Sequence, residues 1–512
     1  MSPRRDSAWF MALAVVWALV MSQLALRTGG VIVDSFQSIG PVAGAAGPGR
    51  LRWPMLGSFL GYDQVWGFHW IGWPLLRSLL LPVLPWHPAF DLALLCVIWA
   101  IAAVVVFRLA ARQGDRAVGW AAGLVTMAAP GLLVVLPSYR PEIPTALLLV
   151  LLLAAWGKSS WRARFSQFVL LVALPLTHPL GLVVPGVWCL VAGYGDWKSG
   201  GFREALRHSW PRGLAIGIGV VLFATWYGLQ PQALAQFRLN VATQRMLVEG
   251  LGAGYLTLFR WGLGGVSTIP LLALLIPAIG WGATMAIRVL TAPGKSPLDP
   301  RVLAGTGVIA AFAFNWVARN PNALHLTAIL PLAAWLFCDA AGHLRRSRLA
   351  WSFWPGLAAS LVVFALFPVR QAVLLMQHRG LSYRSEVADI LEHLPPARRM
   401  LIPVSFWEAA QQQRPLTGID YRFSTFPNIL PRKERTDYET SLLAETRAGD
   451  LLVWDPVQDE AGIFNFVTAT ALKHQLIRPH DNPAEWERLP DASVPVTYSR
   501  GQTAFFEIYR RR

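Results

Sequence analysis

Residues 8–26 read AWFMALAVVWALVMSQLAL, and Ser22 and Gln23 are the only polar members of this run. A helix of about 20 apolar residues crosses the hydrocarbon core of a bilayer. The stretch that follows, residues 27–88, is too polar to cross as a whole. The two segments predict a membrane anchor followed by a large loop, and no small-residue cleavage site indicates that the anchor is removed.

The composition extends this interpretation to most of the chain. Of 512 residues, 54% are apolar and only 14% are charged, and 24 are tryptophan, which is typical of a polytopic α-helical membrane protein. The three cysteines fall inside apolar runs, so no disulfide framework or cysteine-based metal site is indicated. Apolar runs that could span, about eleven in all, lie at 8–26, 89–107, 117–136, 142–156, 166–177, 180–193, 213–229, 261–287, 303–318, 324–341 and 350–368.

The loops between these runs alternate in charge. One set of loops, together with Arg4 and Arg5, holds 18 basic and six acidic residues. An excess of Lys and Arg marks the cytoplasmic side of a membrane. We therefore expect a bacterial inner-membrane protein with a cytoplasmic N-terminus. Since the number of spans is odd, the C-terminus lies on the outer, periplasmic side. The net charge of +16 follows from this topology, and no nucleic-acid partner is expected.

The composition becomes more polar towards the C-terminus, and no spanning run follows residue 368. Helical spacing and short strand-like runs in this tail predict an α/β domain that can bury its own core. The chain is thus divided into a transmembrane domain, 1–368, and an extracytoplasmic α/β domain, 369–512. The elements expected in the tail are a helix at Ser382–Leu394 and strands at Met400–Val404, Leu451–Trp454 and Ala504–Tyr509.

The first outer loop, residues 27–88, holds three ionisable candidates. Asp34 directly follows the apolar run Val31–Val33, so its carboxylate is expected to be partly desolvated and basic enough to act as a general base. The alternative is a helix cap or a solvated loop residue. Asp63 and His69 stand among aromatic side chains. Such a mixture suits the face of a sugar, and the aromatic residues alone suit the ordinary interfacial belt equally well.

Three short outer turns carry further candidates. Arg140 and Glu142 lie in a turn held by three prolines, where Arg140 could bind a phosphate or simply pair with Glu142. His178 lies in a second turn, and a lone His there is more often a structural hydrogen bonder than a ligand. Arg319 and His325 lie at the last turn, where they could meet the head group of an anionic lipid.

The outer segments up to this point contain nine arginines, no lysine and four acidic residues. Guanidinium groups engage phosphate oxygens in pairs, so this excess points to phosphate binding, with arginine-rich codon usage as the alternative. A P-loop, an HExxH motif and a nucleophile elbow are all missing from the sequence, which argues against a nucleotide-powered pump.

This layout resembles the GT-C superfamily of polytopic glycosyltransferases, in particular bacterial members akin to protein O-mannosyltransferases and lipid A aminoarabinose transferase. Asp34 matches the catalytic base of that family by position, although it is followed by Ser35 and Phe36 where the family often shows Asp-Glu with Tyr shortly after, so the second carboxylate is missing. The turn Arg140-Pro141-Glu142 matches an Arg-Pro-Glu-like turn. Arg319 and His325 match the last outer turn, with His where Tyr is common.

The resemblance implies transfer of a sugar from a polyprenyl-phosphate carrier to an acceptor hydroxyl of a lipid, glycan or protein, with inversion at the anomeric carbon. Asp34 would be the base, with Asp63, His69, Arg140, Glu142, His178, Arg319 and His325 binding the substrate and its phosphate. No cofactor is required by the sequence, and the one that it leaves room for is a divalent cation, Mg²⁺ or Mn²⁺.

Two other functions are compatible with the same residues. A transporter or flippase of lipid-linked sugars would show repeated halves and ionisable groups at mid-membrane, whereas this sequence has no repeat and its polar groups gather at the outer ends. A scaffold without enzymatic activity would use only the tail, and Asp34→Asn would leave its function intact.

Overall fold

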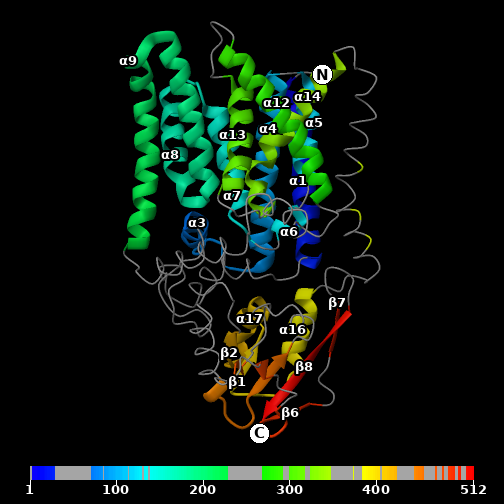
Figure 1. The fold of residues 1–512 in the computed structure, drawn as a ribbon. Coiled ribbons are helices and arrows are strands. Elements are labelled where there is room, and N and C mark those ends of the chain that lie inside the picture. Colours follow the sequence, from blue (N-terminus) through cyan, green and yellow to red (C-terminus); the bar gives the residue numbers. More distant parts are fainter. Residues whose placement is uncertain are drawn as a thin grey trace.

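The computed structural model describes residues 3–28, 71–84, 86–113, 115–129, 132–136, 139–228, 268–291, 299–317, 323–346, 383–403, 406–423, 443–454, 468–469, 476–477, 482–489, 494–497 and 503–512, and single positions at 362, 369 and 373. In these residues a helical bundle carries the N-terminus at one end and a smaller sheet domain at the other (Figure 1). The candidates Asp34, Asp63, His69 and Arg319 lie outside the described residues, and so does the apolar run 350–368 apart from position 362.

The bundle consists of helices that follow the apolar runs of the sequence. They are α1 (Pro3–Thr28), α3 (Gly72–Leu80), α4 (Pro88–Gln113), α5 (Arg116–Met127), α6 (Leu132–Val135), α7 (Glu142–Ala155), α8 (Trp161–Thr177), α9 (Pro179–Gly228), α12 (Thr268–Thr291), α13 (Pro300–Val317), the 3₁₀ helix η2 (Ala323–Ile329) and α14 (Leu330–Arg345).

Among the described residues, five helices are long and apolar enough to cross a membrane: Arg5–Arg27, Pro88–Gln113, Pro179–Trp226, Leu271–Val289 and His325–Arg345. The helix Glu142–Ala155 is also apolar but shorter. The chain is therefore a multi-pass membrane protein, as expected. The number of about eleven spans stays a prediction, and so does the orientation in the membrane.

Three expected spans differ from the observed helices for local reasons. The run 117–136 is divided, because α5 ends at Met127 shortly before Pro130, and a proline cannot continue a helix. The runs 180–193 and 213–229 are joined in α9, whose two arms meet at a bend where Gly201 has a φ of 80°. That backbone conformation is open to glycine without strain. The helix α3, inside the loop 27–88, was not predicted.

The C-terminal domain is a mixed sheet with two helices, α16 (Tyr383–His393) and α17 (Trp407–Thr417). Its strands run in the order β2-β1-β3-β8-β6, with β7 paired to β8; β1 is parallel to β2 and β3, and β8 is antiparallel to its neighbours. The strands are β1 (Arg399–Ile402), β2 (Asp420–Phe423), β3 (Leu451–Trp454), β6 (Trp486–Arg488), β7 (Val494–Thr497) and β8 (Thr503–Arg511), and a separate pair is formed by β4 (Thr468–Ala469) and β5 (Leu476–Ile477).

The expected helix at 382–394 and all three expected strands are confirmed by α16, β1, β3 and β8. The boundary at residue 368 between the two parts stays a prediction. In the described residues, one continuous cluster of buried apolar side chains includes Trp99 and Trp335 of the bundle as well as Trp407 and Phe506 of the sheet domain. The two parts are thus packed against each other.

A buried ion pair stands at this junction. Arg384 of α16 donates from Nε to Glu408 of α17 at 2.5 Å, and its Nη1 donates to the backbone oxygens of Ala25 and Leu26 in α1 at 3.2 and 3.3 Å. Trp407, beside Glu408, packs on Trp86 with ring centroids 5.7 Å apart. Both members of the ion pair are nearly inaccessible to solvent, so each neutralises a charge that would otherwise be buried alone.

Replacing Arg384 with methionine is expected to destabilise the protein by about 3 kcal/mol, because it leaves the carboxylate of Glu408 buried without its partner. Unfolding by denaturant, followed by tryptophan fluorescence, measures this. The control is Arg488→Met, since Arg488 forms a half-exposed pair with Glu507 in the same domain and such pairs contribute about 1 kcal/mol or less. Equal losses in the two variants would contradict a special role for the junction.

Candidate functional site

Three turns that are far apart in sequence bring four polar side chains together. Arg140 and Glu142 stand at the start of α7, His178 lies between α8 and α9, and His325 lies in η2. Arg140, Glu142 and His178 are buried, and the side chain of His325 is 20% exposed. We refer to Arg140, Glu142, His178 and His325 as the polar cluster.

The polar cluster lies towards the end of the bundle that faces the sheet domain. Tyr139, which directly precedes Arg140, is buried, and the charges of Glu408 and Arg384 act on its hydroxyl. Burial first, and then the charge of Glu408, raise the pKa of Tyr139 well above its usual range. Tyr139 has a φ of 50°, a left-handed conformation that is uncommon for a non-glycine residue and often marks functional sites.

Arg140 and Glu142 form a forked ion pair. Nε of Arg140 lies 3.1 Å from both carboxylate oxygens of Glu142, and Nη2 lies 2.7 Å from Oε1. Of the two alternatives that the sequence left open for Arg140, pairing with Glu142 is thus observed. The same guanidinium reaches the edge of His325, with Nη2 at 3.5 Å from Nδ1.

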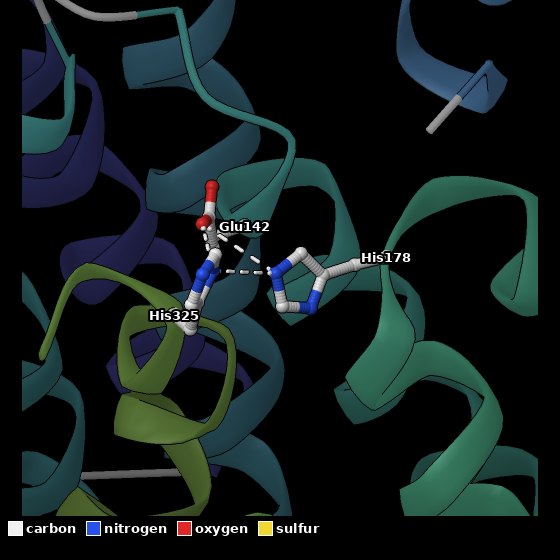
Figure 2. Close-up of side chains that lie close together, drawn as sticks. All are labelled: Glu142, His178 and His325. Atoms are coloured by element: carbon white, nitrogen blue, oxygen red, sulfur yellow. Dashed lines mark hydrogen bonds and ion pairs between the residues drawn. The ribbon is translucent and has the colours of Figure 1, made fainter. Parts of the chain in front are cut away.

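The two histidines meet at the same carboxylate (Figure 2). Nδ1 of His325 lies 2.9 Å from Oε1 of Glu142 and 3.0 Å from Nε2 of His178. Nε2 of His178 lies 3.5 Å from the same Oε1. These three atoms therefore converge on one point, and each can act as a hydrogen-bond acceptor or as a metal ligand.

The protons in the cluster can be assigned from its contacts. The backbone N–H of Leu180 donates to Nδ1 of His178 at 3.2 Å, so this neutral ring carries its proton on Nε2, facing the cluster. Burial lowers the pKa of His178 to about 4, which keeps the ring neutral at physiological pH.

Both histidines can donate to the same carboxylate. A neutral His325 with its proton on Nδ1 donates to Oε1 of Glu142 at 2.9 Å, and the Nε2–H of His178 faces the same oxygen at 3.5 Å. With its proton on the other ring nitrogen, His325 instead turns the lone pair of Nδ1 towards the centre of the cluster, where it can act as a ligand.

Glu142, His178 and His325 have the geometry of a candidate divalent-metal centre, since their ligand atoms lie within 4.8 Å of one another. In the tautomer assigned above, Glu142 and His325 are the two possible ligands, and the N–H of His178 cannot bind a metal but can donate to an oxygen of a group bound there. Imidazole nitrogens favour Zn²⁺, whereas Mg²⁺ prefers oxygen ligands. The imidazole nitrogen thus fits Zn²⁺ better than the two cations for which the sequence leaves room, Mg²⁺ and Mn²⁺.

The structure brings together four of the eight residues proposed from the sequence, Arg140, Glu142, His178 and His325. The other four, Asp34, Asp63, His69 and Arg319, lie outside the described residues and stay predictions. The metal-type grouping of Glu142 with two histidines was not foreseen. The sequence did contain a signal for this grouping, because Glu142, His178 and His325 each lie in a short turn that is assigned to the same side of the membrane.

The comparisons with known proteins were made by sequence and by structure. No protein-family model matches the chain, and no curated protein matches it in sequence. Among solved structures, ArnT from Cupriavidus metallidurans bound to undecaprenyl phosphate is similar with a TM-score of 0.58 and 14% identity, over 99% of this chain and 98% of that one.

Two further structures are similar. The apo state of the same ArnT has a TM-score of 0.56 at 13% identity, over 99% and 98% of the two chains. The oligosaccharyltransferase of Archaeoglobus fulgidus, in complex with Zn and sulfate, has a TM-score of 0.47 at 12% identity, over 86% and 67% of the chains. The agreement with ArnT spans both the bundle and the sheet domain. The chain therefore has the same fold as ArnT.

Proposed function

We propose that this protein is a membrane glycosyltransferase that moves a sugar from a polyprenyl-phosphate carrier to an acceptor hydroxyl. The observation that carries the proposal is the buried polar cluster, which combines a guanidinium with a candidate cation centre in a bundle whose fold is that of ArnT. ArnT has been solved with undecaprenyl phosphate bound. A buried arginine beside a cation centre is suited to an anionic group such as a lipid phosphate.

The polar cluster acts on the departing phosphate in this proposal. When the anomeric carbon–oxygen bond breaks, negative charge grows on the phosphate oxygen. Arg140 and the N–H of His178 stabilise that charge, because donors fixed in a dry site cost little reorganisation. A Zn²⁺ held by Glu142 and His325 would supply Lewis-acid stabilisation of the same oxygen.

Asp34 is the proposed general base. The acceptor hydroxyl attacks the anomeric carbon from the face opposite the phosphate, its proton passes to the Asp34 carboxylate, and the polyprenyl phosphate leaves with the electron pair of the broken bond. One displacement of this kind inverts the anomeric centre. Arg319 is proposed to hold the phosphate as well, and Asp63 and His69 are proposed to contact the sugar.

The reaction is proposed to take place on the outer face of the bacterial inner membrane. Positive-inside charge places the N-terminus in the cytoplasm, and the sheet domain lies at the opposite end of the bundle from the N-terminus (Figure 1). The polar cluster faces that domain, so the acceptor is expected to be a lipid, glycan or protein that reaches the outer surface.

Reconstitution in liposomes tests the proposal. A panel of undecaprenyl-phosphate-linked pentoses and hexoses with radiolabelled sugar is supplied together with an extract of cell-envelope lipids and glycans. The expected result is labelled acceptor together with free undecaprenyl phosphate. If the labelled lipid instead changes leaflets with its sugar–phosphate bond intact, the protein is a flippase and the proposal is wrong.

A further inference from the structure

Arg212, on the second arm of α9, lacks an acceptor for its charge among the described residues. Its guanidinium lies over the ring of Trp156, with Cζ 4.7 Å from the ring centroid. Its Nη1 atom is buried and makes no hydrogen bond in that part of the chain. The side chain as a whole is partly exposed, but a buried guanidinium nitrogen without a hydrogen-bond partner is costly.

Two further polar groups next to Arg212 are also buried without a hydrogen-bond partner among the described residues. The indole Nε1 of Trp156 is buried and has no partner among the described residues, and neither has the hydroxyl of Ser209. Ser209 stands one turn before Arg212 on the same face of α9 and closes against the first arm, since a Cβ on Gly193 would lie 2.8 Å from its Oγ. Trp156, through the stacked ring, and Ser209, one helical turn away, therefore each bring a hydrogen-bond donor next to Arg212.

Asp196, the carboxylate whose charge acts on Arg212, does not form an ion pair with it. The charge of Asp196, on the first arm, reaches Arg212, but its carboxylate contacts the ring of His208 at 3.3 Å. The ion pairs of the described residues leave Arg212 without a carboxylate within 4.0 Å. The binding partner that would satisfy these donors is an anion with several acceptor oxygens, such as a phosphate.

The position of these groups indicates where the anion comes from. Trp156 follows α7 at the opposite end from the polar cluster, and the bend of α9 lies at the same end of the bundle as the N-terminus (Figure 1). Trp161, Trp197 and Trp210 are exposed in the same region, as is typical of side chains at the level of lipid head groups. The cytoplasmic leaflet, which this end is predicted to face, is rich in anionic lipids.

We propose that Arg212, Ser209 and the indole N–H of Trp156 form a binding site for the phosphate of an anionic phospholipid in the inner leaflet. The guanidinium, held flat by Trp156, donates to two phosphate oxygens. Ser209 and the indole N–H complete the set of donors. This site is separate from the polar cluster and does not depend on the proposed transferase function.

Native mass spectrometry of the full-length protein in detergent tests this site. The probes are phosphatidylglycerol, phosphatidylcholine and inorganic phosphate, each added to delipidated protein. We expect one phosphatidylglycerol to be retained preferentially, and Arg212→Gln to weaken its binding roughly tenfold or more, as for the loss of a charged hydrogen bond. Trp156→Phe keeps the stacked ring, removes only the N–H, and should weaken binding to a smaller extent.

The matched control is Arg207→Gln. Arg207 is exposed on the same arm of α9, and its replacement removes the same charge as Arg212→Gln. This variant should retain phosphatidylglycerol as the wild type does. Equal weakening by Arg207→Gln would show attraction to surface charge alone and would overturn the proposal. So would binding of inorganic phosphate or phosphatidylcholine as tight as that of phosphatidylglycerol. Should Arg212→Gln fail to fold, the loss in Trp156→Phe still decides, and unchanged binding there would count against the site.

Discussion

Glu142→Gln is expected to lower the rate of sugar transfer by about 10³-fold, the loss seen when a preorganised stabilising group is removed from the reacting oxygen. Glu142 is the point on which Arg140, His178 and His325 all converge. Its amide cannot neutralise Arg140 or serve as the anionic ligand of a divalent cation. The variant should therefore lose both bound zinc and transfer, which zinc analysis of the purified protein and the liposome assay measure.

The matched control for this variant is Asp91→Asn. Asp91 is likewise a buried carboxylate that pairs with an arginine, Arg77, but it lies on α4 outside the polar cluster. Asp91→Asn should lower stability as much as Glu142→Gln or more, while folded protein retains its zinc and its transfer activity. Loss of transfer in proportion to loss of folded protein in both variants would mean that Glu142 has a structural role only.

Asp34→Asn is expected to reduce kcat by about 10²- to 10⁴-fold, the usual contribution of a general base. The amide cannot take a proton from the acceptor hydroxyl, whereas the carrier phosphate is proposed to bind at the polar cluster. Binding of undecaprenyl phosphate, measured by its effect on tryptophan fluorescence, should therefore stay close to the wild-type value. Normal turnover by Asp34→Asn would remove this residue from the chemistry and would leave another group as the base.

A second carboxylate in the same loop separates binding from catalysis. Asp63 is proposed to contact the sugar, so Asp63→Asn should raise KM for the lipid-linked donor with a smaller effect on kcat. The reverse result, a large loss of kcat in Asp63→Asn and none in Asp34→Asn, would exchange the roles of the two residues.

Much of the fold could be predicted because it follows from local patterns. The apolar runs gave the helices of the bundle, and the strand β3 begins and ends where its sequence, Leu451–Trp454, indicated. Features that depend on neighbouring elements were not predictable in this way. The two arms of α9 continue as helix up to the bend at Gly201, and α3 forms inside a polar loop, where Arg77 is buried against Asp91.

The candidate site was predictable only in part for the same reason. The turn Arg140-Pro141-Glu142 was identified from its residue types. That His178 and His325 meet at Glu142 depends on how α7, α8 and η2 pack, and spacing along the chain carries no information on this. His178 accepts a backbone hydrogen bond from Leu180, which is the structural role that the sequence left open beside binding.

The most direct test of this account is a structure of the protein in lipid nanodiscs with undecaprenyl phosphate and Zn²⁺ added. The lipid phosphate should lie against Arg140 and His178, with the metal between Glu142 and His325. Phosphate and metal density away from the polar cluster, with the cluster itself unchanged, would contradict the account.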